Sequence, residues 1–517
     1  MSRPHDSIEV QDTAIAEPAP ATAAVDETLI RSGKLAGMSM WGAIWVLSWP
    51  VLLESLLSSL MGVVDSTLSA GISADAADAV GGAAYFMWFV ALVSIGLGVG
   101  ATAMISRSMG RGRLGIASAV VGQCTTLGLV LGVLVAGITA VMAPTVATWL
   151  GLGPGAHRLA VVYIYLCAAG VPLQTFVQVG ISCCRGAGDS FRPLMAMLAI
   201  NIINLVLSFL LSGVDLAVAA KGPDGSTVRR VLLENPVSWD MGVAGVALGT
   251  SIAWAIGAVV MLWMLIGGVH GVRLRARRLR PHWHTVRRLL RVGLPNVAET
   301  FGMWLGNFLV ILMVGLMREP GMLGANVITV RIEAFSFLPG FAMSLAAATL
   351  VGTYLGAGSV ELARRAVLRC LWIACGLMAT CGLSFVLFGR QIAGLFTQQA
   401  VHLERVPVCL AVAGLAQPVF AVSIVFRSAL RGAGDTSSVA WITWISIFGL
   451  RLPMAWLFSG VDLPLPGGGL LSNPSPMQAM GVHPLTGLWI GLCLELCIRS
   501  LLFTAAFMRG NWAHKKV

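Results

Sequence analysis

The chain has 517 residues, of which 57% are hydrophobic and only 11% are charged, and its net charge is +11. A soluble globular protein needs a hydrated surface with about a quarter charged residues, so this composition excludes a soluble protein and requires lipid around much of the chain. The basic residues stand in short clusters between apolar stretches, which indicates membrane topology signals and argues against nucleic-acid binding. Ten cysteines without CxxC or Cys/His spacing argue against a disulfide framework or a metal site.

Residues 1–42 are polar, and no cationic stretch leads there into an apolar core with a cleavage site. We therefore expect a disordered cytoplasmic tail and not a signal peptide. Twelve apolar stretches of helix length follow, none with sustained period-two alternation, so the sequence predicts an all-α polytopic membrane protein. The predicted spans are 43–70, 80–106, 115–142, 159–184, 192–213, 242–268, 290–316, 323–352, 366–389, 406–430, 437–459 and 485–508.

The distribution of Lys and Arg predicts how the chain lies in the membrane. The side that holds both tails and the even-to-odd connections carries 24 of these residues, and the other side carries seven. Positive residues stay on the cytoplasmic side, so we expect both termini in the cytoplasm and the chain in the plasma (inner) membrane. The most basic connection, 269–289, joins two halves, and we expect it to be a linker that contacts anionic lipid headgroups.

The sequence repeats itself along its whole length. The motif RGAGD stands at 185–189 and again at 431–435, and SGVDL stands at 212–216 and again at 459–463. Each half holds six spans, an even number, so both halves insert the same way round. This predicts two parallel six-helix repeats related by a pseudo-two-fold axis along the membrane normal, with a cavity between them. The expected parts are an N-terminal lobe at 43–268, a C-terminal lobe at 290–508 and a cytoplasmic tail at 509–517.

Five segments in the same order resemble the multidrug and toxic compound extrusion (MATE) family over about 43–512. They are PVLLESLLSSLMGVVDSTLSAG in the first span, the two RGAGD turns, RIEAFSFLPGFAMSLAAATLVGTYLGAG in the eighth span, Arg451-Leu-Pro453 in the eleventh and Arg509-Gly-Asn-Trp512 at the end. The resemblance implies two six-helix lobes and export of organic cations driven by inward flow of protons or sodium.

The resemblance also implies an ion site in the N-terminal lobe. Asp65 in the first span matches the aspartate that takes the coupling ion, Asn204 matches an asparagine that accompanies it, and Thr250 matches a hydroxyl in the same network. Family members usually have a second carboxylate four residues after the asparagine, where this sequence has Ser208. One acid in place of two favours protons over sodium as the coupling ion, because a sodium site prefers several oxygens with net negative charge.

Other charges inside the spans are candidates because such residues are costly in a bilayer. Glu299 follows a proline by four residues near the start of its helix, where a structural role and an ion role are equally compatible with the helix dipole. Arg331 and Glu333 lie on opposing faces of the eighth span and need partners elsewhere. We expect a C-terminal network of Arg331, Glu333, Arg451 and Glu495, which acts either as a structural clamp or as an ion relay. The arginines of the RGAGD turns are expected to face cytoplasmic headgroups.

No HExxH, GxSxG or Walker pattern occurs, so the sequence argues against an enzyme or an ATP-driven pump. The leading hypothesis is a secondary active antiporter that exports small, largely apolar or cationic organic compounds by alternating access. The alternative is a flippase for lipid-linked precursors, which would use a cationic cavity and is kept open by Arg331 and Arg451. We expect no cofactor beyond the coupling ion and no obligate protein partner, with small organic substrates and membrane lipids as the partners.

Overall fold

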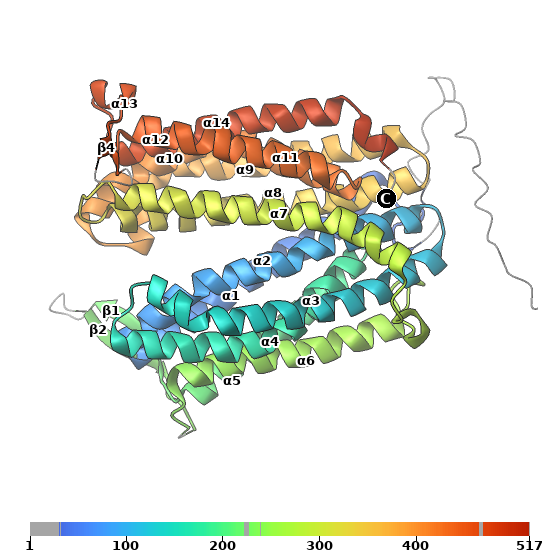
Figure 1. Cartoon of the computed structure of the whole chain (residues 1–517), viewed down its shortest axis with the longest axis horizontal. Coiled ribbons are helices and arrows are strands. Elements are labelled where there is room, and N and C mark those ends of the chain that lie inside the picture. Colours follow the sequence, from blue (N-terminus) through green and yellow to red (C-terminus); the bar gives the residue numbers. More distant parts are fainter. Residues whose placement is uncertain (1–29, 31–32, 222–226, 238, 465–468, 516–517) are drawn as a thin grey trace, which may run out of the picture.

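The computed structural model describes residues 30, 33–221, 227–237, 239–464 and 469–515. Its helices form two lobes that lie side by side, with the first half of the chain in one lobe and the second half in the other (Figure 1). Twelve helices in the described ranges are long and apolar enough to cross a membrane. They overlap all twelve predicted spans, so the predicted class of an all-α polytopic protein built from two six-helix halves is confirmed.

The N-terminal lobe contains six long helices that follow one another along the chain. A serine caps the start of two of them, since Ser39 and Ser73 each accept a hydrogen bond from a backbone N–H three residues on. The helices are α1 (Met40–Ile72), α2 (Ala74–Gly110), α3 (Leu114–Trp149), α4 (Pro154–Gly186), α5 (Phe191–Ser212) and α6 (Gly242–Gly267).

The C-terminal lobe repeats this arrangement, with one interruption in its fifth span. The helices are α7 (Trp283–Gly315), α8 (Met322–Gly356), α9 (Val360–Phe396), α10 (Ala400–Gly432), α11 (Thr436–Ser446), α12 (Leu452–Ser459), the short α13 (Pro476–Ala479) and α14 (Pro484–Met508). Between α11 and α12 the chain forms a π-helical turn, η2 (Ile447–Arg451). Pro453 is the second residue after this turn, and because proline has no N–H to donate, the regular α-helical ladder is broken at this point.

Two small β-hairpins lie at one end of the lobes and were not predicted from the sequence. β1 (Leu216–Lys221) pairs antiparallel with β2 (Thr227–Leu233), and β3 (Leu463–Pro464) pairs antiparallel with β4 (Leu470–Leu471). Each hairpin follows one SGVDL motif. We call this end of the molecule the hairpin end, and the opposite end, which holds the connection between α6 and α7 and the last residues of the chain, the linker end (Figure 1).

The same anchor fixes both hairpin loops. Asn235 N donates to Asp215 Oδ1 at 2.8 Å, and Asn473 N donates to Asp462 Oδ1 at 2.8 Å. Each asparagine side chain also donates to a backbone carbonyl at the end of the preceding helix, Phe209 in the first lobe and Trp456 in the second. The aspartate of the repeated SGVDL motif therefore serves as the acceptor that turns each loop back onto its lobe.

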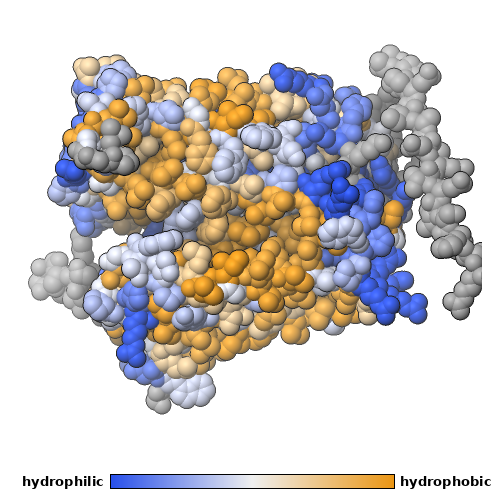
Figure 2. All heavy atoms as spheres, in the orientation of Figure 1, coloured by the Kyte–Doolittle hydropathy of each residue, from blue (hydrophilic) through white to orange (hydrophobic). Residues whose placement is uncertain are grey.

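The outer surface is apolar around its middle and polar at the linker end, as Figure 2 shows. Large side chains such as Trp263, Trp372 and Leu415 are 75–76% exposed on α6, α9 and α10. Exposure of such a surface to water would be unfavourable, whereas in a bilayer it is solvated by lipid. The surface therefore agrees with the twelve membrane-spanning helices.

Both ends of the described chain pack against the C-terminal lobe, although we expected the N-terminal tail to be disordered. Of the tail 1–42, residues 1–29 and 31–32 lie outside the described residues, but Ile30, Leu35 and Met40 are buried against α8 and α9. In the tail 509–517, Trp512 is buried and its indole N–H donates to the Phe507 carbonyl at 2.7 Å. Burial of these apolar side chains holds both stretches against the lobe. The expectation of disorder is therefore wrong for the described part of the tail 1–42.

The linker predicted at 269–289 is shorter in the structure. α7 already begins at Trp283, inside the predicted linker. Its first turns form an amphipathic helix, since Leu289 and Val292 are buried at helical spacing while the arginines around them stay at the polar end. The rest of the linker is held on α3, where Gln123 Nε2 donates to the carbonyls of Arg278 and Arg280, both at 2.8 Å. Lipid contact by its arginines stays a prediction.

The two lobes meet along a seam near the linker end. A Cβ atom on Gly110 of α2 would collide with the Thr353 carbonyl of α8, and one on Gly356 would collide with the Arg107 carbonyl. Thr349 Oγ1 of α8 donates across the seam to the Arg185 carbonyl at 3.4 Å. Small residues thus bring the backbones of the two lobes into direct contact at this end.

Candidate functional site

Asp65 lies inside the N-terminal lobe among the three polar residues that the resemblance implied. Thr250 Oγ1 of α6 donates to Asp65 Oδ2 at 3.4 Å. Asn204 Nδ2 of α5 donates to Thr250 Oγ1 at 2.9 Å and to Ser208 Oγ at 3.2 Å. The fold therefore brings together four residues from α1, α5 and α6, although Asp65 and Thr250 are 185 positions apart in the sequence.

The charge of Asp65 is not balanced by a cation. Among the described residues, six acidic side chains are buried, and five of them are ion-paired to an arginine, lysine or histidine. Asp65 is the exception, and its Oδ1 has no hydrogen-bond partner in the described part of the chain. Its side chain is only 8% exposed. A buried carboxylate without a cation is costly in the charged form, so this position favours taking up a cation or a proton.

The arginines of the two RGAGD turns do not face headgroups, so that prediction is wrong. Arg185 Nη2 at the end of α4 lies 2.7 Å from Glu54 Oε2 of α1. Arg431 Nη2 at the end of α10 lies 2.6 Å from Glu299 Oε2 of α7, in the corresponding place of the second lobe. In each lobe, a glutamate that stands four residues after a proline thus pairs with the arginine of the RGAGD motif. We call this repeated ion pair the clamp; it ties the first helix of each lobe to the fourth.

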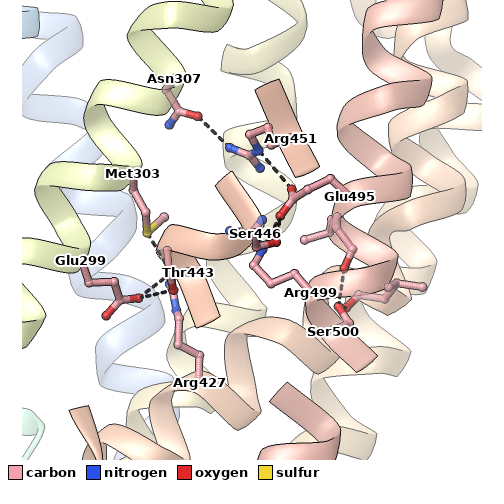
Figure 3. A network of polar contacts seen from close by, with 12 residues as sticks. Glu299, Met303, Asn307, Arg427, Thr443, Ser446, Arg451, Glu495, Arg499 and Ser500 are labelled. Carbon is pink, nitrogen blue, oxygen red and sulfur yellow. Dashed lines mark hydrogen bonds and ion pairs between the residues drawn. The ribbon is translucent and has the colours of Figure 1, made fainter. Parts of the chain in front are cut away.

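Glu299 is held more firmly than its counterpart Glu54. It is fully buried, Thr443 Oγ1 donates to its Oε1 at 3.1 Å, and Arg427 Nη1 lies 3.8 Å from the same oxygen. Arg427 also lies against Met303, with its Nη1 3.1 Å from the Met303 sulfur (Figure 3). Two arginines already neutralise this carboxylate, so of the two roles considered for Glu299 its contacts support the structural one.

Glu495 of α14 is the centre of a second buried network in the C-terminal lobe (Figure 3). Arg451 Nε donates to its Oε2 at 3.0 Å, Arg499 Nε lies 3.1 Å from its Oε1, and Ser446 Oγ donates to the same oxygen. Arg451 Nη1 also donates to Asn307 Oδ1 of α7 at 2.8 Å. Arg451 is the last residue of the π-helical turn, so the break in this helix presents the guanidinium to both α7 and α14.

Two members of the predicted C-terminal network take other places. Glu333 interacts electrostatically with Arg451 but makes no ion pair within 4 Å among the described residues. Arg331 is exposed on α8 and has no hydrogen bond or ion pair with any described residue, so its assignment to the network is wrong. The physical reason is helix geometry: two residues two positions apart point to opposing faces, and here only the Glu333 face turns into the lobe.

Several members of these networks carry no charge and were therefore not predicted from the charges in the spans. Asn307, Thr443 and Ser446 are neutral, and the sequence offers no signal that separates them from other polar residues in the spans. Arg185 and Arg431 had a usable signal, because each repeats at the same spacing as a buried glutamate, Glu54 or Glu299. A repeat that preserves both an acid and a base indicates a pair.

Two lobes of six membrane helices, each enclosing buried charges and meeting at a seam of small residues, define the class of polytopic membrane transporters. The MatE family model matches residues 50–210 and 295–457, which include parts of both lobes. The chain therefore belongs to this family of multidrug efflux transporters and is a transporter, not an enzyme.

Relatives are similar over nearly the full length of the chain. The probable multidrug resistance protein NorM of Thermotoga maritima is 26% identical over 91% of this chain and 93% of its own length. The multidrug resistance protein MdtK of Yersinia pseudotuberculosis is 24% identical over 92% of this chain and 96% of its own. These names apply to the relatives.

Solved structures share the fold. A MATE family transporter of the MOP superfamily in an outward-facing conformation has a TM-score of 0.78 at 21% identity and covers 95% of this chain and 98% of its own. A MOP superfamily transporter from Pyrococcus furiosus, described as having a binding pocket of reverse polarity, has a TM-score of 0.77 at 19% identity, with 95% and 98% covered.

Proposed function

We propose that this chain is a secondary active antiporter that exports small organic compounds in exchange for protons, with the seam between the lobes opening alternately to the two sides. The observation that carries the proposal is Asp65, the one buried acid of the described residues without a cationic partner. Each of the other five acidic side chains that are buried in the described part of the chain has a cationic partner within 4 Å, whereas Asp65 keeps a free oxygen for an ion from outside.

The surroundings of Asp65 support protons over sodium. The nearby side-chain oxygens are the hydroxyls of Thr250 and Ser208 and the amide of Asn204, all neutral. A sodium site prefers several oxygen ligands with net negative charge, and here only one carboxylate contributes. A proton needs a single desolvated acid.

The contacts between the lobes support alternating access. They join α2, α7 and α8 near the linker end, where Gly100 of α2 lies against Leu289 and Gly293 of α7 and Gly352 of α8 lies against Ser106. The distribution of basic residues predicts that the linker end is cytoplasmic. In that orientation the lobes are closed towards the cytoplasm, and a rocking motion of one lobe against the other would exchange the open side.

The test is transport into or out of proteoliposomes under a pH gradient alone and then under a sodium gradient alone. We expect wild-type transport to follow the pH gradient, and Asp65→Asn to abolish it while the protein stays folded, because asparagine keeps the shape but carries no titratable proton. Asp240→Asn makes the same change at an exposed aspartate of the hairpin end and is expected to leave transport unchanged.

Two results would contradict this proposal separately. Full activity of Asp65→Asn under a pH gradient would remove Asp65 from the mechanism. Wild-type transport that needs sodium and does not depend on pH would overturn the assignment of protons as the coupling ion. The proposed antiport function would then still stand, with sodium as the coupling ion.

A second candidate, a flippase for lipid-linked precursors, is favoured by one observation. Arg331 is an exposed cation on a membrane helix, and a diphosphate headgroup needs such a group. Transfer of a lipid-linked diphosphate across the bilayer of proteoliposomes without any ion gradient would favour this candidate over the antiporter.

A further inference from the structure

Arg331 lies where a solute between the lobes would meet it. It is nine residues from the start of α8 at Met322, about 14 Å along the helix from the hairpin end. Its side chain is exposed, and Phe335, one turn further on, is 48% exposed. Residues four apart on a helix lie on the same face, so the guanidinium and the ring form one exposed surface.

The face of α8 that carries these two residues is the face that meets the other lobe. Thr349 and Thr353 follow Arg331 and Phe335 by eighteen residues each, which is five turns at about 3.6 residues per turn. Thr349 donates to the Arg185 carbonyl of the N-terminal lobe, and the Thr353 carbonyl lies against Gly110. Arg331 and Phe335 therefore continue the seam face of α8 towards the hairpin end, where that face is uncovered.

A water-filled opening is the environment in which such an arginine is stable. A guanidinium at this depth costs several kcal/mol when it faces hydrocarbon, so exposed charges in membrane helices face a cavity. Figure 2 shows the molecule hollowed between the two lobes towards the hairpin end. Phe89 of α2 and Trp304 of α7, 4.8 Å apart between ring centroids, pack across the seam. Trp304 is eleven residues, about 16 Å, from the hairpin end of α7 and so lies at a depth similar to that of Arg331.

The other charges nearby leave Arg331 uncompensated. Glu299 and Glu495 are each shared by two arginines, and Glu333 points to the opposite face of α8 towards Arg451. In the N-terminal lobe Asp65 is buried behind the surface of α1. Asp78 of α2 stands four residues from the start of its helix, about 8 Å nearer the hairpin end than Arg331.

We propose that Arg331 determines substrate specificity by binding the acidic group of an amphipathic organic anion, while Phe335 contacts its apolar part. This inference rests on the proposed export function and names its substrate class, in place of the apolar or cationic compounds expected from the sequence. A guanidinium binds a carboxylate or sulfonate through two parallel hydrogen bonds, which also orients the ligand. A cation in the same place would meet a fixed positive charge, and Glu333, the acid of α8, points to the opposite face of the helix.

The experiment compares two dyes that share a ring system and differ in charge. Carboxyfluorescein is an anionic xanthene and rhodamine 123 is a cationic one. Equilibrium binding of each dye to the purified full-length protein is measured by fluorescence anisotropy, and gradient-driven transport is measured separately in proteoliposomes. The variants are Arg331→Gln, Arg331→Lys and, as the matched control, Arg390→Gln at an exposed arginine of α9 in the same lobe.

We expect the wild type to bind carboxyfluorescein more tightly than rhodamine 123. Arg331→Gln should weaken carboxyfluorescein binding roughly tenfold or more, because a charge-assisted hydrogen bond is lost. Arg331→Lys should retain part of the affinity because it keeps the charge, and Arg390→Gln should retain all of it. Competition by farnesyl diphosphate and by naphthalene sulfonate then distinguishes a lipid-linked acid from a water-soluble aromatic acid as the source of the anion.

Binding and transport separate the two proposals. Anion binding that depends on Arg331, without gradient-driven transport of either dye, would support this inference and contradict the export function. Tighter binding of rhodamine 123, or carboxyfluorescein binding that is equal in wild type and Arg331→Gln, would overturn the inference even if gradient-driven transport is observed.

Discussion

Glu495 is held between Arg451 and Arg499 inside the C-terminal lobe, and its carboxylate is fully buried. Removal of the acid would leave two buried guanidinium groups without a counter-charge. We expect Glu495→Gln to lower the free energy of unfolding by about 3–5 kcal/mol, measured by denaturant titration in detergent micelles. Arg451→Met should lower the free energy of unfolding by less, because Glu495 still has Arg499 as a partner. The double variant Arg451→Met/Glu495→Gln should lose less stability than the sum of the two single losses.

The matched control for this cycle is the pair Glu361 and Arg365 of α9. Its atoms lie 2.9 Å apart, almost as close, but both side chains are about half exposed. Exposed pairs contribute little, so Glu361→Gln should change stability by less than about 0.5 kcal/mol. Strictly additive losses at Arg451 and Glu495 would show that the two residues do not interact.

At the residue scale, the sequence allowed some contacts to be predicted and not others. The pair of Glu495 with Arg451 followed from the scarcity of charges in the spans. The three polar residues around Asp65 followed from resemblance to a family. Arg331 was misplaced, because hydropathy marks a helix as membrane-spanning without showing which of its faces turns towards its own lobe and which towards the other lobe.

At the element scale, the clamp between the first and fourth helix of each lobe allows a comparison within one molecule. Glu54 has one arginine partner and is 6% exposed, whereas Glu299 has two arginines and Thr443 and is fully buried. Removing the more deeply buried charge leaves more buried groups without a partner. We therefore expect Glu299→Gln to lower the thermal unfolding midpoint in detergent more than Glu54→Gln does, with both below wild type. Equal midpoints for the two variants would contradict this account of the repeat.

Helix positions were predictable because each span must satisfy its backbone hydrogen bonds internally and be about 20 apolar residues long. Helix ends were not, since α9 runs from Val360 to Phe396 and extends beyond the span predicted at 366–389. Charged residues at the ends of that helix lower its hydropathy without ending it. The two hairpins were missed for another reason, because their strands have only two to seven residues, far fewer than a membrane span needs.

At the scale of the whole molecule, the repeat explains how two lobes of similar build hold different chemistry. The clamps and the hairpin anchors recur in both lobes, so they belong to the shared scaffold. The unpaired Asp65 belongs to the first lobe and the exposed Arg331 to the second. We infer that the duplicated parts hold the helices in place, while the unmatched residues carry ion coupling inside the first lobe and substrate binding at the opening between the lobes.

The seam near the linker end should act as a gate that depends on small residues. Gly110 of α2 lies against the Thr353 carbonyl of α8, and a larger side chain there would meet backbone, which has no rotamer to change. We expect Gly110→Val to hold the lobes apart at this end and to favour the state open towards the linker end. A cysteine introduced at the buried seam residue Thr349 should then react several-fold faster with a membrane-impermeant maleimide added from the linker side.

Gly137→Val of α3 is the matched control, because a Cβ atom on Gly137 meets nothing within 4 Å. It should leave both the labelling rate at position 349 and transport unchanged. Labelling is measured as the increase over the same variant without the added cysteine, since the chain has ten native cysteines. Gly110→Val should also slow transport, because a carrier that does not close on one side does not complete its cycle. If Gly110→Val labels at the rate of the Gly137→Val control and transports normally, contact at this glycine is not part of the gate, and closure would have to depend on the α2–α7 contacts around Gly96 and Val297.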